Sequence, residues 1–394
     1  MNPNQLMQQL IEEQKIAGAV LRVRQKGQII FDEAQGYADL SAKRTADADT
    51  IYRLASMSKP VTGIAIMQLV EQGRLKLEDP LERFLPAYSE MLVANKANNP
   101  DKPEESALLD GFRLEAARRP ITIGMMLNHS SGLGHAAMGT WLIKSPLIFQ
   151  SLKQTANQMA HVPLDFHPGE GTGYSALFAF DLLGRVVEIV SGQSFDDYLN
   201  EHLFKPLGIR DVCYLPDHGQ QTRIARIYSC SEGRAPIDMT DDPSENLLRI
   251  DPLLHGYFSG AGGLYGSLNA YERIALALLN NGTLDGVKIL KPETVRQMAT
   301  PYDEQVPIPG MRWGLSVAVY DGTGRSRWIG PGSFGWSGGF GTHFYVDPGH
   351  ELVMTLMINQ TNMVAINPVF LAVEEAVYRT FVGTEYRGLR NSFE

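Results

Sequence analysis

The sequence predicts a mixed fold of the α/β (α+β) class, with one antiparallel sheet built from both chain ends and flanked by helices. Strand-like runs lie near both ends, and apolar helical patterns fill the middle. The chain has 394 residues with 44% apolar content, which is enough for more than one domain. We assign residues 1–75 and 215–394 to the sheet-bearing domain and residues 76–214 to an inserted, mostly helical domain.

The first part of the chain predicts a helix, a hairpin and a buried helix, in that order. Apolar residues fall on one side of an acidic amphipathic helix over residues 3–16. A hairpin over residues 18–38 has its turn at Lys26-Gly27. From Ser56 to about residue 72 the pattern is helical and apolar on nearly all sides, which indicates a buried helix.

The rest of the chain changes from helical to strand-like patterns near residue 215. Short helices are expected at 121–128, 148–160, 175–191 and 195–204. Aromatic and β-branched runs follow at 313–319, 342–346 and 352–358. Asp347-Pro348-Gly349-His350 forms a turn between the last two, so they should pair antiparallel. An amphipathic helix over roughly 367–382 ends the pattern.

The composition argues against several classes of partner. The net charge of −9 and the absence of a basic run disfavour nucleic acid and anionic membranes. No stretch is long and apolar enough to span a bilayer, and the N-terminus lacks the pattern of a signal peptide, so a cytoplasmic protein is expected.

Cys213 and Cys230 are interpreted as reduced thiols. The nine histidines show no metal-ligand spacing, and we expect neither a metal nor a cofactor. His129 and His135 are interpreted as structural. The oligomeric state is left open.

Ser56-Met57-Ser58-Lys59 is the strongest local signal for chemistry. A serine hydroxyl is a weak nucleophile until a nearby base removes its proton, and a lysine with a lowered pKa can be that base. The spacing puts Ser56 and Lys59 on one helical face. It also leaves Ser56 at a helix N-terminus, where free N–H groups favour developing negative charge. The competing interpretation is an N-capping serine followed by a solvated lysine.

Two glycine-rich segments provide further candidates. Residues 166–176 deliver Tyr174 to the start of a buried helix, although an aromatic staple would give the same pattern. Gly335-Trp336-Ser337-Gly338-Gly339 leads into a core strand, where a β-bulge or a tight turn would give the same composition.

Together these segments resemble the serine β-lactamase-like superfamily, which includes class C β-lactamases, penicillin-binding proteins, D-amino-acid peptidases and family VIII carboxylesterases. The motifs occur in the family's order over nearly the whole chain. They are Ile51–Pro60 around Ser56, Leu127-Asn128-His129-Ser130-Ser131-Gly132-Leu133, Tyr174-Ser175-Ala176, Ser259–Leu264 and Trp336-Ser337-Gly338.

The resemblance implies a role for each matching residue. Ser56 would be the nucleophile, Lys59 its activator, and Tyr174 the group that passes the proton to the leaving group. The backbone N–H groups of Ser56 and Gly339 would form the oxyanion hole. Either Lys59 or Tyr174 can act as the base, and the sequence does not choose between them.

Two departures from the family pattern favour an ester over a lactam as substrate. Lactamases and penicillin-binding proteins begin the third motif with a lysine that holds a carboxylate, whereas this chain has Trp336, as in family VIII carboxylesterases. With Ser337 and Gly338, this residue is predicted to bind the substrate. Ala176 replaces an asparagine that would bind an acylamino group. Losing both polar groups favours small neutral esters.

Several further hypotheses are compatible with the sequence. The same Ser-Lys-Tyr site would serve a β-lactamase, a D-aminopeptidase or an acyltransferase acting on a small ester or amide. A non-catalytic penicillin-binding domain would keep the fold alone. The segment at 335–339 also fits the G-x-S-x-G elbow of α/β-hydrolases, with Ser337 as nucleophile, but that interpretation requires a helix after the serine.

Overall fold

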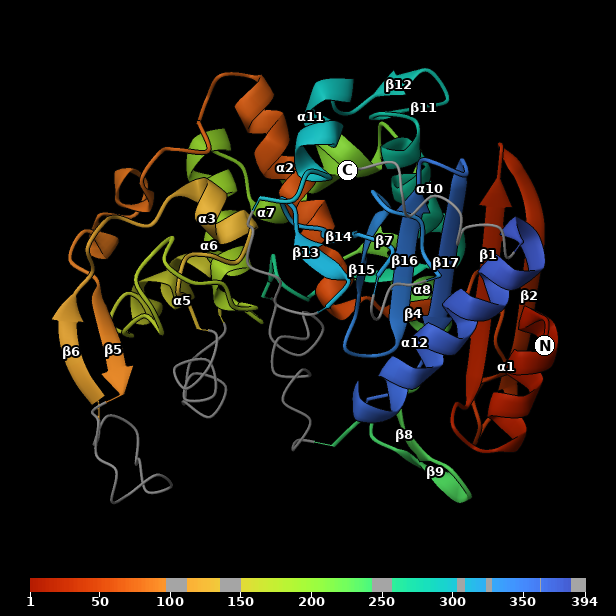
Figure 1. The fold of residues 1–394 in the computed structure, drawn as a ribbon. Helices are drawn as coiled ribbons and strands as arrows, with labels where there is room; N and C mark the ends of the chain where they lie inside the picture. The colour runs from red at the N-terminus through yellow and green to blue at the C-terminus, as the bar shows by residue number, and fades with distance from the viewer. Residues whose placement is uncertain are drawn as a thin grey trace.

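The centre of the protein is a sheet of eight antiparallel strands in the order β13-β14-β15-β16-β17-β1-β2-β3 (Figure 1). The computed structural model describes residues 1–96, 112–134, 150–242, 257–302, 309–323, 328–361 and 363–383. Strand β1 (Gly18–Gln25) pairs with β17 (Leu352–Ile358), so the two ends of the chain close a single sheet. This confirms the predicted fold class.

The two predicted hairpins of the sheet are confirmed. Strand β2 (Gln28–Asp39) follows β1 through Lys26 and Gly27, whose φ angles of 49° and 77° suit a two-residue turn. Strand β16 (Thr342–Asp347) pairs antiparallel with β17, and the Asp347 carboxylate accepts a hydrogen bond from the backbone N–H of His350 at 3.1 Å.

The run 313–319 does not form one continuous strand. Strand β13 ends at Trp313 and β14 begins at Ala318, because Ser316 adopts a φ of 66° and turns the chain between them. Strands β13 (Met311–Trp313) and β14 (Ala318–Tyr320) then pair as an edge hairpin.

Helices cover both faces of the sheet. On β16, Phe344 contacts Tyr271 of α10 (Leu268–Leu279), with ring centroids 5.2 Å apart. The preceding residue, His343, points to the other face and stacks on Phe370 of α12 (Met363–Val377), with centroids 4.8 Å apart. In Figure 1, α12 crosses the sheet on the near side and α1 (Pro3–Glu12) lies close to it.

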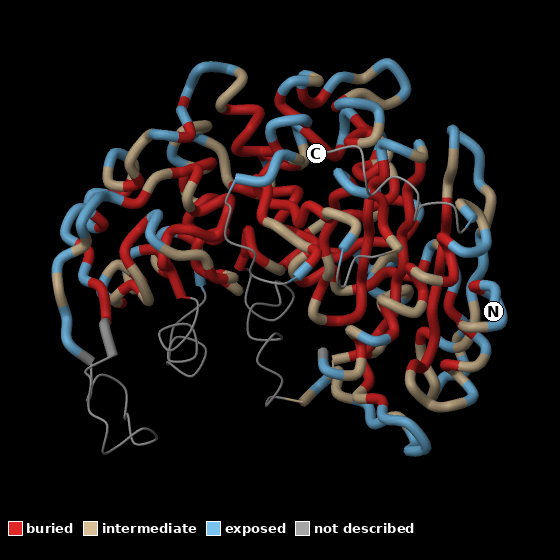
Figure 2. The backbone as a smooth tube through the Cα atoms, in the orientation of Figure 1, coloured by how far each residue is buried: buried red, intermediate tan, exposed pale blue. Residues whose placement is uncertain are grey.

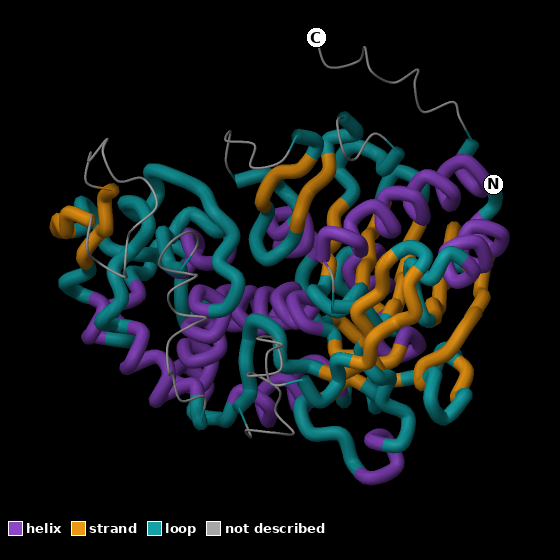
Figure 3. Tube along the Cα trace, turned by 90° about the horizontal axis from the view of Figure 1, so that it is seen from below, coloured by secondary structure: helices purple, strands orange, loops and turns teal. Residues whose placement is uncertain are grey.

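A mostly helical region lies beside the sheet, as Figure 3 shows from below. Helix α2 (Ser58–Glu71) packs against α6 (Phe178–Ser191) and is buried on almost every side, as its apolar sequence predicts. Figure 2 shows that buried residues run without a break from these helices into the sheet. The domain boundaries at residues 75 and 215 stay a prediction.

Most of the predicted helices are found with shifted ends. The helix predicted over 3–16 ends at Glu12, the one predicted at 148–160 is described from Leu152, and the last helix continues as a π-helical turn, Tyr378–Val382. Besides α6, the helices described between residues 112 and 242 are α3 (Ile123–Leu127), α5 (Leu152–Met159), α7 (Phe195–Leu199) with the π-helical turn Asn200–Phe204, and α8 (His218–Gln221). Helix α11 spans Pro292–Met298. None of the described helices has the length and apolar character needed to cross a membrane.

The remaining strands are short. They are β3 (Arg44–Thr45), β4 (Ile51–Arg53), β5 (Leu92–Lys96), β6 (Phe112–Ala116), β7 (Val212–Cys213), β8 (Tyr228–Ser231), β9 (Arg234–Asp238), β10 (Tyr265–Ser267), β11 (Thr283–Leu284), β12 (Val287–Lys288) and β15 (Phe334–Ser337). Strands β4, β10 and β7 form a small second sheet. Its strand β4 ends at Arg53, shortly before Ser56.

Candidate active site

Ser56 lies between strand β4 and helix α2. It occupies a 3-10 turn, Ala55–Met57, that continues directly into the helix. Ala55 adopts a φ of 46°, a left-handed conformation that costs about 1–2 kcal/mol for a residue with a side chain. The backbone is therefore held in an unfavourable conformation directly before Ser56, which is a frequent feature of functional sites.

Lys59 is fully buried, as the apolar surroundings of its helix predict. Its Nζ lies 3.1 Å from Ser56 Oγ, 2.8 Å from the carbonyl oxygen of Ala176 and 2.9 Å from that of Ala261. Both carbonyl oxygens accept hydrogen bonds from Nζ, and its third oxygen neighbour is the Ser56 hydroxyl, so Lys59 lies within proton-transfer distance of the nucleophile.

Tyr174 completes the contacts of Ser56. Its hydroxyl lies 2.7 Å from Ser56 Oγ, and Lys59 Nζ lies 5.0 Å from the centre of its ring. His129 holds this segment on both sides of the tyrosine: its carbonyl oxygen accepts from Gly173 N–H at 2.9 Å, and its Nδ1 accepts from Ser175 N–H at 3.2 Å. His129 is thus structural, as expected, whereas His135 lies outside the described residues.

Asp181 is a buried carboxyl that the sequence analysis missed. It accepts hydrogen bonds from Tyr257 Oη at 2.8 Å, from Ser259 Oγ at 2.6 Å and from Ala261 N–H at 3.2 Å. Burial raises the pKa of Asp181 to about 6, although these hydrogen bonds and the nearby charge of Lys59 lower it. The carbonyl oxygen of Ala261 accepts a hydrogen bond from Lys59 Nζ, and the N–H of the same residue donates to Asp181. Asp181 therefore fixes the backbone segment that positions the lysine. Its signal was an acidic residue within an otherwise apolar stretch of α6.

The glycine segment after β15 lies against the backbone that leads to Ser56. A side chain at Gly338 would come within 2.2 Å of both the Leu54 carbonyl oxygen and Thr342 Oγ1, so only glycine fits there. Phe340 and Ala55 belong to one small buried cluster with Ile227. Between Gly338 and Phe340, Gly339 N–H donates no hydrogen bond to the backbone of the described residues. This N–H is therefore available beside the Ser56 segment, and its place in an oxyanion hole remains a prediction.

Trp336 forms an aromatic wall next to Tyr174. Only 5% of this residue is exposed, and its ring centroid lies 5.4 Å from that of Trp313, 5.6 Å from His129 and 6.0 Å from Tyr174. Trp313 was not predicted to belong to the site. These rings give the surroundings of Tyr174 an apolar character.

The α/β-hydrolase interpretation of Ser337 is wrong. Strand β15 ends at Ser337, and the chain turns through Gly339 into a second strand, β16, so no helix follows the serine. Instead, Ser337 Oγ lies 2.9 Å from His343 Nδ1 on the neighbouring strand.

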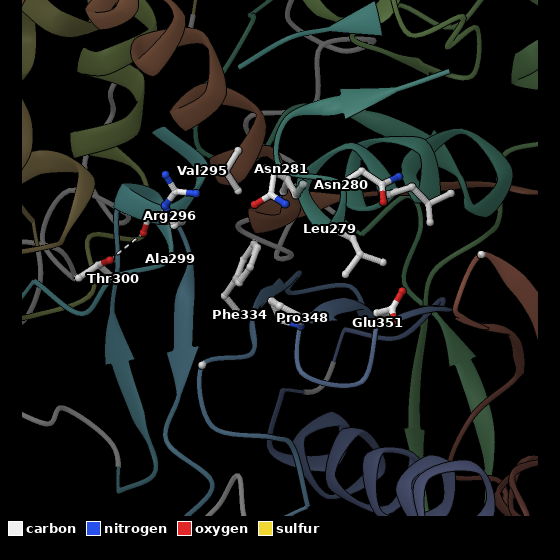
Figure 4. A pocket seen from close by; sticks show the side chains of 14 residues that line it. Leu279, Asn280, Asn281, Val295, Arg296, Ala299, Thr300, Phe334, Pro348 and Glu351 are labelled. Carbon is white, nitrogen blue, oxygen red and sulfur yellow. Dashed lines mark hydrogen bonds between the residues drawn. The ribbon is translucent and has the colours of Figure 1, made fainter. Parts of the chain in front are cut away.

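A cavity of about 690 Å³ lies at the opposite end of the central strands (Figure 4). It is lined by residues that include Arg296, Asn281, Phe334 and Glu351. Phe334 begins β15, whereas Ser337 ends it, so the cavity is separated from Ser56 by the length of that strand. Its lining contains none of Ser56, Lys59 and Tyr174, and we place the chemistry at those residues, where nucleophile and base are in contact.

The described residues hold no group of three or more His, Cys, Asp or Glu side chains that would bind a metal ion. Cys213 and Cys230 are both free, as expected. Burial raises the pKa of each thiol to about 12, which makes neither a ready nucleophile.

Comparisons with known proteins cover nearly the whole chain. The family model described as Beta-lactamase matches residues 3–369. The chain is 31% identical to Protein Rv1367c of Mycobacterium tuberculosis, covering 95% of each protein. It is 29% identical to Esterase EstB of Burkholderia gladioli, over 94% of this chain and 93% of the relative. Among solved structures, EstCE1, described as a hydrolase with promiscuous acyltransferase activity, is 26% identical with a TM-score of 0.74, over 95% of this chain and 97% of EstCE1.

Proposed function

Because the chain belongs to the β-lactamase family and is a serine hydrolase of that family, we propose that it is a carboxylesterase that hydrolyses small neutral esters through an acyl-enzyme on Ser56. The observation that carries this proposal is the position of Ser56 Oγ, 3.1 Å from Lys59 Nζ and 2.7 Å from Tyr174 Oη.

The reaction takes place in two steps. Ser56 Oγ attacks the ester carbonyl while Lys59 or Tyr174 takes its proton, and the backbone N–H groups of Ser56 and Gly339 stabilise the oxyanion. Tyr174 returns the proton to the departing alcohol. Water then enters, gives its proton to the same pair of groups and releases the acid, which restores Ser56.

The surroundings of Tyr174 support a neutral substrate. The third motif begins with Trp336, as in family VIII carboxylesterases, and its indole replaces the cation that would pair with the carboxylate of a lactam. Ala176 offers Lys59 only its backbone carbonyl and has no side-chain amide for an acylamino group. Esterase EstB, a relative by sequence, is named for the same kind of reaction.

Intact-mass spectrometry of the enzyme mixed with 4-nitrophenyl acetate tests the proposal. We expect an adduct of one acetyl group on Ser56 and a burst of nitrophenol, both absent in Ser56→Ala. The control is Ser337→Ala, which should still form the adduct. An unimpaired Ser56→Ala enzyme would overturn the proposal.

A second candidate is acyl transfer to an alcohol, with the same acyl-enzyme. The similarity to EstCE1, whose description includes acyltransferase activity, favours it over hydrolysis of a lactam or of a D-amino-acid amide. Adding a primary alcohol to the ester assay distinguishes transfer from hydrolysis, because a transferase forms the new ester faster than the free acid. A chromogenic cephalosporin and a D-amino-acid amide tested in parallel measure β-lactamase and D-aminopeptidase activity. We expect turnover of both to be slower than that of the ester.

A further inference from the structure

Lys59 and Asp181 are two buried groups of opposite charge that share one neighbour, Ala261. The Ala261 carbonyl oxygen lies 2.9 Å from Lys59 Nζ, and its N–H lies 3.2 Å from Asp181 Oδ1. Lys59 is fully buried and Asp181 is 2% exposed. Their helices, α2 and α6, pack against each other. The backbone of a single residue therefore separates the carboxyl group from the amine that contacts Ser56.

Neither group forms an ion pair within the described part of the chain. Lys59 Nζ contacts one hydroxyl and two carbonyl oxygens, all of them neutral. The three donors to Asp181 are neutral as well. The other buried carboxyl groups that the structure describes each have an arginine or histidine side chain at 2.8–3.0 Å, and they are Glu272, Asp347 and Glu374. Because a buried charge is costly without an opposite charge, Lys59 and Asp181 are complementary.

The backbone between the two groups is also held by contacts that do not involve Asp181. Thr62 Oγ1 donates to the Gly260 carbonyl oxygen at 2.7 Å. A methyl group at Gly260 would lie only 2.3 Å from the Phe180 carbonyl oxygen, so this segment packs closely on α6. We therefore expect the segment to stay in place when Asp181 loses its charge but keeps its shape.

The charge of Asp181 matters when Ser56 loses its proton. The Ser56 O–H bond breaks, its oxygen bonds to the ester carbonyl carbon, and a neutral Lys59 amine takes the proton and becomes an ammonium. A carboxylate close to this new positive charge stabilises it, since water does not screen the two buried groups. Burial raises the pKa of Asp181 to about 6, so most of this carboxyl is ionised at neutral pH.

We propose that Asp181 is a positioning residue that acts through Lys59, by supplying the negative charge that stabilises the ammonium formed when Ser56 is deprotonated. Asp181 contacts neither Ser56 nor, in this scheme, the substrate, and it remains a carboxylate throughout the step. The inference rests on the proposed acyl-enzyme at Ser56. It adds a charge to the site that the contacts of Ser56 alone do not include.

Few other titratable groups surround this pair. Tyr174 faces Lys59, with its ring centre 5.0 Å from Nζ. Tyr257 donates to Asp181, and Tyr214 donates to the Ser259 carbonyl oxygen. Burial raises the pKa of Tyr257 and of Tyr214 well above the ordinary range, so both stay neutral. Helix α3 has no titratable side chain, and the charged side chains of the other helices packed on α6 are at least partly exposed: Lys153 of α5 and Asp196 and Asp197 of α7.

The pH dependence of activity in Asp181→Asn is the first test, because asparagine keeps the shape of the side chain and removes its charge. We measure kcat/KM for 4-nitrophenyl butyrate between about pH 5 and 9. The plateau should fall by about tenfold, and the midpoint of the acid limb should move to lower pH by about one unit. Removing a negative charge favours the deprotonated form of Lys59 and of Tyr174 alike, so the direction is the same for either base.

The shift of the acid limb distinguishes a charge effect from a structural one. A purely structural role of Asp181 would lower the plateau and leave the midpoint in place. Asp211→Asn is the matched control, since Asp211 pairs with Arg223 away from the candidate site, and it should change neither quantity. An unshifted midpoint in an active Asp181→Asn enzyme overturns the inference.

The second test measures the same coupling from the side of Asp181 and needs no substrate. In enzyme labelled with ¹³C-aspartate, the Asp181 carboxyl resonance, assigned through the backbone of α6, should titrate at about pH 6. Lys59→Met should move this midpoint to higher pH, because the carboxylate loses a nearby positive charge. Each test uses a different variant, so one of them decides where the other variant does not fold.

The two tests also distinguish this inference from the proposed function. An unchanged Asp181 midpoint in Lys59→Met overturns the inference alone, whatever esters the unmodified enzyme hydrolyses. If Ser56 takes no acyl group from any ester, the proposed function fails and the role of Asp181 in it fails as well.

Discussion

Lys59 shows how a buried lysine can be accommodated next to a nucleophile. Its Nζ has three oxygen neighbours, so burial leaves no donor without an acceptor. The two carbonyl groups fix the direction of the third contact, toward Ser56. The geometry therefore depends on the backbone at Ala176 and Ala261 as much as on the lysine itself.

Lys59→Met tests this arrangement at the residue scale. Methionine has a similar length and no basic nitrogen, so we expect kcat/KM for a neutral ester to fall by about 10²–10⁴. Steady-state kinetics with 4-nitrophenyl butyrate measure the loss, and circular dichroism checks that the fold is retained. Lys153→Met, a change in α5, is the control and should leave kcat/KM unchanged. Activity of Lys59→Met within tenfold of the unmodified enzyme would contradict a role as base.

Asp181→Asn should change how stability depends on pH. Because burial raises the pKa of Asp181 from 3.8 to about 6, the folded state binds this proton more tightly than the unfolded state. The free energy of unfolding therefore falls as the pH rises from about 4 to about 6, by up to about 3 kcal/mol, and is level above that range. The variant lacks this fall. Urea unfolding of both proteins at several pH values measures the difference.

Asp211 serves as the control for this prediction, because its pKa is lowered where that of Asp181 is raised. Arg223 lowers the pKa of Asp211, so that ion pair adds stability above the ordinary pKa of the carboxyl, which is lost as the pH falls below about 4. Asp211→Asn should thus differ from the unmodified protein by a constant amount between about pH 4.5 and 7. If the free energies of unfolding of Asp181→Asn and the unmodified protein differ by the same amount at every pH, burial does not raise the pKa of Asp181.

Single residues differ in how well the sequence predicts them. The sequence indicates Ser56 and Lys59 because residues three positions apart meet where a helix begins. It indicates Tyr174 through a glycine-rich turn and the family resemblance. Asp181 has its partners in the 257–261 segment, and Glu374 contacts His343 from another element, so no local pattern contains them. Contacts of that kind follow from packing, which the sequence does not show.

At the scale of elements, helix α2 depends on close contact with the turn between β13 and β14. A methyl group at Gly63 would lie 2.4 Å from Ser316 Cβ and 2.2 Å from its Oγ. Ser316 itself adopts a φ of 66°, and its N–H donates to the Leu127 carbonyl oxygen at 2.9 Å. The turn is thus held from two sides and has little freedom to move away from the helix.

Gly63→Ala is expected to destabilise the protein by about 1–3 kcal/mol, because the added methyl group must displace this turn. Thermal unfolding measures the change. Gly219→Ala, in helix α8, is the control: its nearest neighbour would be an oxygen of the Asp217 side chain at 3.3 Å, so we expect no loss beyond a few tenths of a kcal/mol. An equal melting temperature for Gly63→Ala and the unmodified protein would contradict the tight contact.

The same turn explains an error in predicting elements. Residues 313–319 are rich in β-branched and aromatic types, which favours a strand throughout. The contact of Gly63 with Ser316 and the bond to Leu127 impose a turn instead. Tertiary contacts overrode the local preference there, whereas 342–346 and 352–358, with a strong turn signal between them, were predicted correctly.

At the scale of the whole molecule, a buried ion-pair cluster joins the first strand to a helix late in the chain. Glu272 of α10, 3% exposed, contacts Arg22 at 3.2 Å and Arg24 at 2.9 Å. Arg22 also contacts Asp32 at 2.8 Å. The cluster ties β1 and β2 to the layer of helices behind the sheet.

Glu272→Gln should destabilise the protein by about 3 kcal/mol, because Arg22 loses its fully buried partner. Asp241→Asn is the matched control, since Asp241 pairs with Arg226 at 2.8 Å on the surface and should cost less than about 1 kcal/mol. Urea unfolding distinguishes the two, and equal midpoints would contradict the structural weight given to the cluster.

The pairing of β1 with β17 also has a consequence during synthesis. Ala19 pairs with Ile358, so β1 has no partner on that side until the residues of β17 have left the ribosome. Gly338, which lies against the Leu54 carbonyl oxygen, is likewise made long after Ser56. A nascent chain therefore carries its nucleophile for most of translation without the glycine segment beside it. Ester hydrolysis by ribosome-bound chains of increasing length should begin abruptly, late in synthesis, and would time the closure of the sheet.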